Sequence, residues 1–143
     1  MAMFCINKKY ASPLLLLLLI AANVADLHGD IQRDSNNIKW NTALTEKGDS
    51  MTAGRPGGAP GVPHDILTGS DSEGRAFAVP GLIDTTCNNW TADDANHRTV
   101  VGHGDRFGGG NSSWNSAHPT KDCSKQGIIE YGGAGLLYCF AIN

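Results

Sequence analysis

The sequence lacks several patterns that would identify common classes of protein. Lysine and arginine account for 11 of its 143 residues against 14 aspartates and glutamates, and no basic patch interleaved with aromatic residues occurs. Because surfaces that bind nucleic acid are basic, we expect no nucleic-acid partner. The chain contains no internal repeat, and its length allows one domain at most.

Signatures of catalysis are also missing. The glycine-rich segment Gly132–Gly135 is not followed by the Lys-Ser/Thr pair of a phosphate-binding loop, and no serine stands in a nucleophile elbow. No two histidines have a short paired spacing such as H-x-x-x-H, and a catalytic zinc needs three ligands. We therefore expect no enzyme and assign no metal ligand; the histidines concerned are His64, His97, His103 and His118.

No apolar run is long enough to cross a bilayer as a helix. The segment from Ala11 to Ala22 has about a dozen residues, whereas a membrane-spanning helix needs roughly 20. Basic residues precede it and small residues follow it, an order typical of a secretory signal peptide. We expect residues 1–25 to be a signal peptide cleaved near Ala25, with an uncleaved anchor as the alternative. The mature chain is then secreted or extracellular, in the periplasm or on the cell surface if the source is a bacterium, with no stable membrane insertion.

Glycine and proline predict loops along much of the mature chain. They are dense between Met51 and Pro63, which indicates an exposed loop. The segment Gly69–Arg75 is typical of a tight turn, because the Asp71 carboxylate can accept hydrogen bonds from the backbone amides that follow it. We further expect a short helical turn at Thr42–Gly48.

Three cysteines and two tryptophans stand in the last third of the chain, at Cys87, Cys123, Cys139, Trp90 and Trp114. Together with the glycine-rich loops they indicate a small extracellular module held by disulfide bonds. The apolar run near the C-terminus is predicted to be a buried strand whose cysteine is tied elsewhere in the core. An odd number of cysteines in a secreted protein indicates an intermolecular bridge or a reactive thiol.

Five motifs follow one another in the mature chain. They are H-D-I-L-T-G-S at His64–Ser70, C-N-N-W-T at Cys87–Thr91, V-G-H-G-D-R at Val101–Arg106, S-W-N-S-A-H-P at Ser113–Pro119 and G-G-A-G-L-L-Y-C-F at Gly132–Phe140. In these motifs the chain resembles secreted, mainly bacterial, proteins with a C-type-lectin-like domain. The turn at Gly69–Arg75 and the Cys-x-x-Trp after it are also similar to the endostatin domain of collagens. The resemblance covers nearly all of the mature chain.

The resemblance implies an α+β, C-type-lectin-like fold, loop-rich with short antiparallel strands. Residues 26–143 would form a partial domain of this kind, because the family's opening strand and cysteine-bearing helix have no counterpart after the signal segment. A disulfide between Cys87 and Cys123 is implied, and Cys139 is then left unpaired, without the partner that the family provides. A dimer linked through Cys139 is a hypothesis that follows.

The function implied is that of a secreted lectin-like binding module that recognises carbohydrate without catalysis. The alternative is an extracellular protein-interaction or matrix module of the same fold with no sugar site. Sugar sites combine an aromatic face with amide or carboxylate groups. The candidate ligand-binding residues, in or beside the loop from Gly102 to Gly110, are Trp114, Asn115, His118, His103 and Asp105.

Calcium is the only cofactor that the resemblance suggests. Calcium-dependent sugar binders of this fold carry a Glu-Pro-Asn or Gln-Pro-Asp loop and a Trp-Asn-Asp strand, whereas Trp114-Asn115 is followed here by Ser116. We therefore expect no cofactor, with calcium as a weaker alternative. For Trp114 the alternative to ligand binding is core packing. An exposed Trp114 favours the lectin, and a buried one favours the interaction module.

Overall fold

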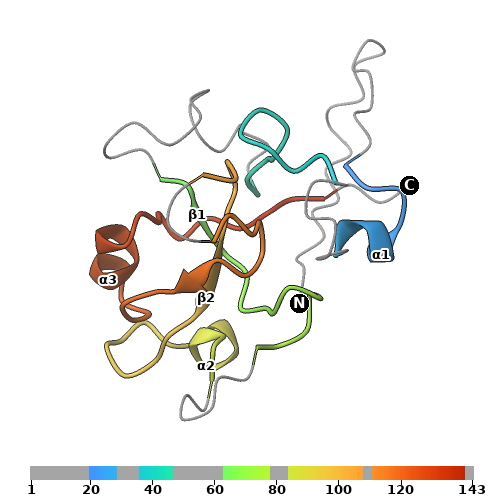
Figure 1. Ribbon diagram of the computed structural model, residues 1–143. Coiled ribbons are helices and arrows are strands. Elements are labelled where there is room, and N and C mark those ends of the chain that lie inside the picture. Colours follow the sequence, from blue (N-terminus) through green and yellow to red (C-terminus); the bar gives the residue numbers. More distant parts are fainter. Residues whose placement is uncertain (1–19, 29–35, 47–62, 78–83, 108–110, 141–143) are drawn as a thin grey trace.

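The computed structural model describes residues 20–28, 36–46, 63–77, 84–107 and 111–140. The expected signal segment up to residue 19 and the glycine-proline loop at residues 51–62 lie outside this part of the chain. Among the described residues, no helix has the length and apolar character needed to cross a membrane. The elements are short and joined by loops (Figure 1): the helices are α1 (Val24–Leu27), α2 (Cys87–Trp90) and α3 (Lys125–Glu130), and the strands are β1 (Asp65–Leu67), β2 (Val100–His103) and β3 (His118–Pro119).

The three strands form one antiparallel sheet in the order β1-β2-β3. This result confirms the prediction of a loop-rich, mixed helix and strand structure with short antiparallel strands. Asp65 pairs with His103, and His118 pairs with Val101. Residues paired across strands share a face, as do residues two apart within a strand. The register therefore places Asp65, His103 and His118 on one face of the sheet.

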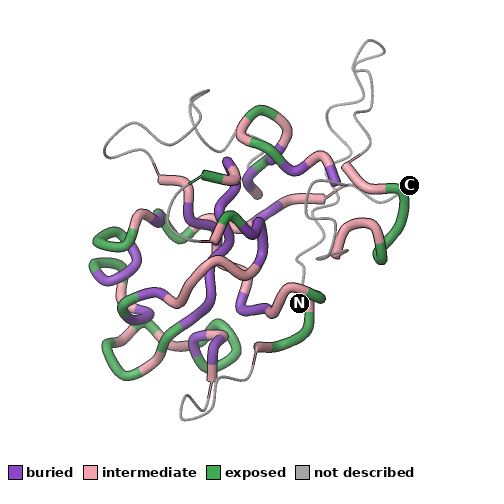
Figure 2. Tube along the Cα trace, in the orientation of Figure 1, coloured by how far each residue is buried: buried purple, intermediate pink, exposed green. Residues whose placement is uncertain are grey.

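The opposite face of the sheet carries the hydrophobic core. Ile66 pairs with Gly102 on this face and is fully buried in a cluster with Trp114, Tyr138, Ile38 and Ala43. Figure 2 shows buried residues concentrated along β1 and β2. One sheet thus separates the hydrophobic core from a face on which Asp65, His103 and His118 lie beside Val101 and Leu67.

Gly102 allows the loop before β3 to pass directly over the sheet. A Cβ atom built at this position would lie 1.6 Å from the backbone oxygen of Trp114 and 2.5 Å from the backbone nitrogen of Asn115. Only glycine permits such an approach. The S-W-N-S segment is therefore pressed against β2, with the Trp114 ring directed into the core.

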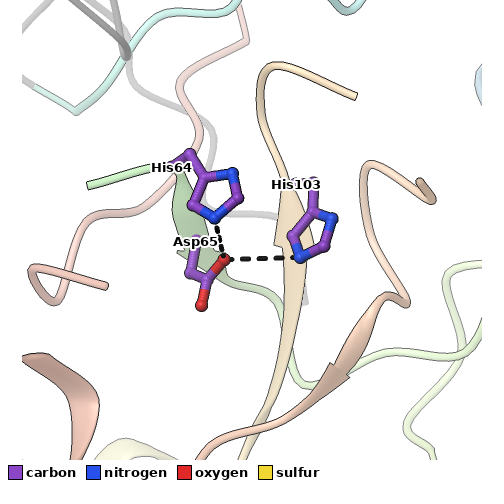
Figure 3. Close-up of side chains that lie close together, drawn as sticks. All are labelled: His64, Asp65 and His103. Carbon is purple, nitrogen blue, oxygen red and sulfur yellow. Dashed lines mark ion pairs between the residues drawn. The ribbon is translucent and has the colours of Figure 1, made fainter. Parts of the chain in front are cut away.

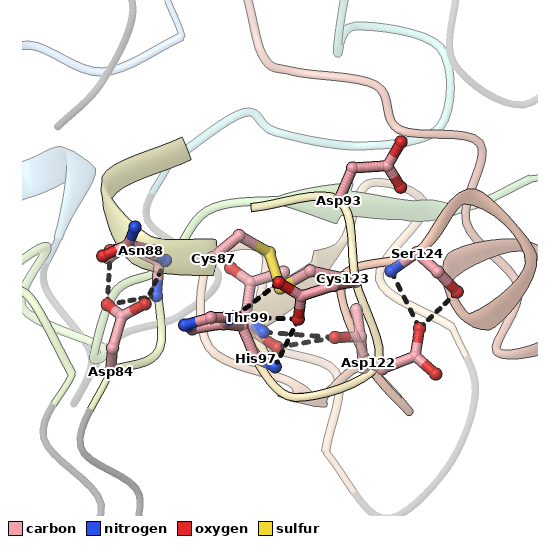
Figure 4. Close-up of a disulfide and its surroundings, with 12 residues drawn as sticks. Asp84, Cys87, Asn88, Asp93, His97, Thr99, Asp122, Cys123 and Ser124 are labelled. Carbon is pink, nitrogen blue, oxygen red and sulfur yellow. Dashed lines mark hydrogen bonds and ion pairs between the residues drawn. A yellow bond between two sulfur atoms is a disulfide. The ribbon is translucent and has the colours of Figure 1, made fainter. Parts of the chain in front are cut away.

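The predicted disulfide between Cys87 and Cys123 is present, with the two Cα atoms 5.7 Å apart. It ties α2 to the segment that leads into α3 (Figure 4). Ser124 begins α3 as its N-cap, because its hydroxyl accepts a hydrogen bond from the Gly127 amide at 3.0 Å. Cys139 lies elsewhere, half-buried as a thiol, and a dimer through it stays a prediction.

Two local predictions had different outcomes. The turn at Gly69–Arg75 is confirmed, because the Asp71 carboxylate accepts hydrogen bonds from the amides of Glu73 at 3.0 Å and Arg75 at 2.8 Å. The helical turn expected at Thr42–Gly48 is wrong over the part that is described. Thr45 instead forms an isolated antiparallel bridge with Tyr138, so a partner distant in sequence decides the conformation.

Candidate functional site

The polar face of the sheet gathers three imidazole rings around one carboxyl group. Asp65 is 1% exposed, and its Oδ1 atom lies 3.4 Å from Nε2 of His64 and 3.5 Å from Nε2 of His103. Its Oδ2 atom lies 3.6 Å from Nε2 of His118. Figure 3 shows the rings of His64 and His103 directing a nitrogen toward the same oxygen of Asp65. We call His64, Asp65, His103 and His118 the histidine cluster.

The end of α3 holds the first two members of the cluster in place. The backbone oxygen of Gly132 accepts hydrogen bonds from the amides of His64 at 3.0 Å and Asp65 at 3.3 Å, and the backbone oxygen of His64 accepts one from Gly104 at 2.9 Å. His103 and His118 come from β2 and β3. The cluster is therefore assembled from three segments: His64-Asp65 at the start of β1, β2 and β3.

A second layer of contacts orients two of the rings. Nδ1 of His64 lies 3.2 Å from Oδ1 of Asp105, which also accepts a hydrogen bond from the Phe107 amide at 2.9 Å. Nδ1 of His118 lies 3.0 Å from the backbone oxygen of Pro119. A carbonyl oxygen only accepts, so Nδ1 of His118 carries the proton. In the neutral ring, the lone pair is then on Nε2, the atom that faces Asp65.

Burial dominates the electrostatics of the cluster. It raises the pKa of Asp65, an effect that His118 and His64 partly offset. It also lowers the pKa of His103 to about 4, helped by repulsion from His64 and His118. His103 is therefore neutral at physiological pH, and the proton on Asp65 is held more tightly than on an exposed aspartate.

The pKa values of His64 and Asp105 shift in the opposite direction to those of His103 and Asp65. The hydrogen bond with Asp105 raises the pKa of His64 despite burial. For Asp105 itself, burial alone would raise the pKa, but the hydrogen bonds from His64 and from the Phe107 amide outweigh it and lower the pKa. His64, a member of the cluster, is thus paired with Asp105, which lies beside the cluster.

Several buried polar atoms of this site have no hydrogen-bond partner among the described residues. They include both carboxylate oxygens of Asp65 and Nε2 of His103, which is 2% exposed. Buried polar groups are nearly always hydrogen-bonded in folded proteins, and leaving one unsatisfied costs about 1–3 kcal/mol. The donor atoms of His64, Asp65 and His103 also lie within 4.8 Å of one another, close enough to hold a metal ion together.

The sequence-predicted residues divide between the two faces of the sheet. His103, His118 and Asp105 lie in or beside the histidine cluster. Trp114 is 6% exposed and stacks on His28, with a ring-centroid distance of 5.4 Å. The Trp114 ring therefore offers no open face for a sugar in this conformation.

Asn115 holds two loops together rather than facing solvent. Its buried amide donates hydrogen bonds to the backbone oxygens of Asp71 at 3.0 Å and Ser72 at 3.1 Å. The amide thereby fastens the turn at Gly69–Arg75 to the S-W-N-S segment. This role uses both hydrogens of the side-chain nitrogen, so Asn115 has no donor left for a ligand.

From the sequence, His64 was considered as a metal ligand and not assigned, because no second histidine stands at a short paired spacing, and Asp65 was not singled out. The cluster is instead assembled across three segments of the sheet. A usable signal was present, since His64-Asp65 and His103 both stand at the ends of short apolar runs that suit strands. Pairing those two runs in the observed register brings Asp65 opposite His103.

An open groove of about 590 Å³ adjoins the cluster on its solvent side. His118, whose side chain is 36% exposed, belongs to both the cluster and the groove. The ring of Tyr131, a residue that is 50% exposed, lies 6.4 Å from the His118 ring, centroid to centroid. The lining residues are Arg98, His118, Pro119, Thr120, Glu130 and Tyr131.

Comparisons with protein-family models, with curated proteins and with solved structures gave no significant match.

Proposed function

We propose that this chain is a secreted, non-catalytic binding module of the C-type-lectin-like fold that recognises carbohydrate in the groove beside β3 and the end of α3. The observation that carries this proposal is the half-exposed Tyr131 ring among groups that form hydrogen bonds. Arg98, Glu130 and His118 line the same groove. Sugars stack their C–H surfaces on aromatic rings while such polar groups bind their hydroxyls.

The proposal moves the carbohydrate contact away from the residues that the sequence favoured. Trp114 and Asn115 are buried on the core side of the sheet, and His103 and Asp105 are buried with the cluster. Of the five sequence candidates, His118 alone lines the groove. Tyr131 takes the aromatic role that the motif-based reading gave to Trp114.

Three further observations support the class of protein. The disulfide implied by the family resemblance is present, and disulfides are typical of secreted proteins. The short antiparallel strands agree with the loop-rich fold that the five motifs imply. The N-terminal segment has the order of a signal peptide.

A protein partner is the second candidate, and two observations favour it. Trp114 is buried, which is the condition that distinguishes an interaction module from a lectin in this fold. Ile129 and Tyr131, at the end of α3, are also large side chains that are about half-exposed. Exposed apolar side chains with a polar surround are typical of protein contact sites.

A glycan array with the secreted chain tests the proposal, run with and without EDTA. We expect specific binding that falls about tenfold or more in Tyr131→Ala, because stacking on one ring contributes on the order of 1–1.5 kcal/mol beyond its buried area. Phe107→Ala is the matched control, since Phe107 is equally exposed but does not line the groove.

Two outcomes would contradict carbohydrate binding in the groove. Equal loss in both variants would show that the groove is not the contact surface. No binding by chains whose near-ultraviolet circular dichroism shows a folded core would move the proposal to a protein partner.

A further inference from the structure

We propose that His64, Asp65, His103 and His118 bind a zinc ion on the polar face of the sheet. This inference does not depend on carbohydrate recognition, because His64, Asp65 and His103 do not line the groove and His118 is the one residue that the two sites share.

The spacing of the donor atoms fits a shared ion better than direct hydrogen bonds. Nitrogen-to-oxygen hydrogen bonds are about 2.9 Å long, whereas the three histidine Nε2 atoms lie 3.4 Å, 3.5 Å and 3.6 Å from the Asp65 oxygens. Zinc binds nitrogen and oxygen at about 2.0–2.2 Å, so two ligands of a tetrahedral ion are about 3.3–3.6 Å apart. The separations between the Asp65 oxygens and the three histidine nitrogens fall in this range.

The atoms of the cluster that lack hydrogen bonds are the atoms that would bind an ion. Both oxygens of Asp65 and Nε2 of His103 lack a hydrogen-bond partner among the described residues, and both side chains are more than nine-tenths buried. They converge on one point from paired positions of β1 and β2. A cation at that point satisfies the carboxylate and the imidazole lone pairs together.

The outer contacts have the form that metal sites require. A histidine ligand usually donates its second ring nitrogen to a carboxylate or a backbone oxygen, which fixes the nitrogen that binds the metal. Asp105 fills this place for His64, and the backbone oxygen of Pro119 fills it for His118. His97, which pairs with Asp94 at the surface, is a useful comparison because it lies outside the cluster.

The donor set selects the type of ion. Three imidazole nitrogens and one carboxylate suit zinc and its neighbours among the transition metals. Calcium and magnesium prefer all-oxygen sites, so the calcium considered from the family resemblance does not fit here. The donor atoms of His64, Asp65 and His103 lie within 4.8 Å of one another, and we assign His118, whose Nε2 lies 3.6 Å from Oδ2 of Asp65, as the fourth and most exposed ligand. Four protein ligands correspond to a closed structural site.

Metal binding is tested with the whole secreted chain, produced without a histidine tag, stripped with a chelator and dialysed. Calorimetric titration with zinc chloride should give one ion per chain with a dissociation constant below about 1 μM. Elemental analysis after gel filtration measures retained metal. Cobalt chloride, used as a spectroscopic probe, should give the strong visible absorption of a four-coordinate ion, and calcium chloride should give no heat.

Variants identify the site. Asp65→Asn and His103→Ala should weaken zinc binding by about 100-fold or more, and Asp105→Asn by about 10–100-fold, because Asp105 acts only through His64. His118→Gln, at the half-exposed ligand, is the variant least able to disturb folding, and it should alter the cobalt spectrum. His97→Ala is the matched control and should bind as the unmodified chain does.

The proposal fails if the unmodified chain takes up no zinc in a saturable way. It also fails if His118→Gln and Asp65→Asn, shown to be folded by near-ultraviolet circular dichroism, bind zinc as tightly as the His97→Ala control. Neither result depends on the glycan array, so failure of one proposal is distinguishable from failure of the other.

Discussion

The two faces of the sheet differ in how their polar groups are satisfied. On the core face, the buried hydroxyl of Tyr138 donates a hydrogen bond to the backbone oxygen of Trp114 at 2.8 Å. On the other face, Asp65 and His103 are buried with atoms that have no hydrogen-bond partner among the described residues. Both faces belong to the same short strands. The contrast shows that the unsatisfied hydrogen-bonding groups are confined to one face, and in folded proteins such groups call for an explanation, of which a bound water or ion is one.

The pKa shifts repeat this contrast. Burial raises the pKa of Tyr138, but its hydroxyl remains neutral and hydrogen-bonded, so the shift has no chemical consequence at physiological pH. Burial lowers the pKa of His103 to about 4, which leaves a neutral imidazole whose Nε2 faces Asp65. The same physical cause gives a structural group on one face and a potential metal ligand on the other.

Gly102→Ala should have the largest effect on the free energy of unfolding, because it displaces β2, whose side chains contribute to both faces of the sheet. The added Cβ would lie 1.6 Å from the backbone oxygen of Trp114, so β2 and the S-W-N-S segment must separate. We expect a loss of about 4 kcal/mol or more in the free energy of unfolding, measured by urea denaturation followed through tryptophan fluorescence.

Gly135→Ala is the control for this prediction. No atom lies within 4 Å of a Cβ built at Gly135, whose φ of +72° leaves only backbone strain. That strain costs about 1–2 kcal/mol. Equal losses in the two variants would show that the close approach at Gly102 is unimportant.

Trp114→Ala should damage the core face alone. Removing a buried tryptophan typically costs about 3–5 kcal/mol, and the ring of Trp114 packs against Tyr138 and Phe140 as well as His28. Urea denaturation measures the loss, and Trp90→Ala, at a tryptophan that is 37% exposed, should lose much less. We expect the folded Trp114→Ala chain to keep its zinc affinity. A parallel fall in affinity would mean that the two faces are coupled.

Asp65→Asn should have the smallest effect on the free energy of unfolding. We expect this effect to be larger when zinc is present. Without metal, the change keeps the side-chain shape and removes a buried carboxyl group whose oxygens have no hydrogen-bond partner among the described residues, so we expect a difference of about 1 kcal/mol or less. At zinc concentrations about 100 times the dissociation constant, the unmodified chain gains about 2.7 kcal/mol that the variant does not. Thermal unfolding with and without zinc measures both terms, and an equal rise in melting temperature for the two chains would contradict the proposed site.

The sequence predicted the local features of this fold better than the assembled ones. The turn at Gly69–Arg75 was predictable because Asp71 and the amides it binds are a few residues apart. The loop-rich, disulfide-linked character followed from composition, and the Cys87–Cys123 pairing followed from the family resemblance. Thr45 escaped prediction because its bridge partner, Tyr138, is distant in sequence.

The histidine cluster could not be derived from spacing in the sequence. Its members come from β2, β3 and the start of β1, and only the strand register brings them to one face. The role of Trp114 was open for a related reason. An aromatic residue suits a core and a sugar site equally well. The close approach of the Trp114 backbone to Gly102 places the Trp114 ring in the core.

Side chains along β2 alternate between the two faces of the sheet, and this alternation limits how the sequence can change over evolutionary time. Within Val100–His103, successive side chains serve opposite faces of the sheet. Inserting or deleting one residue there would reverse every face assignment beyond that point, which would turn His103 toward the apolar core. Substitutions can accumulate one position at a time on either face, but length changes in β2 cannot. Descendants of this chain should therefore vary in length at their loops while the residue count of this strand stays constant.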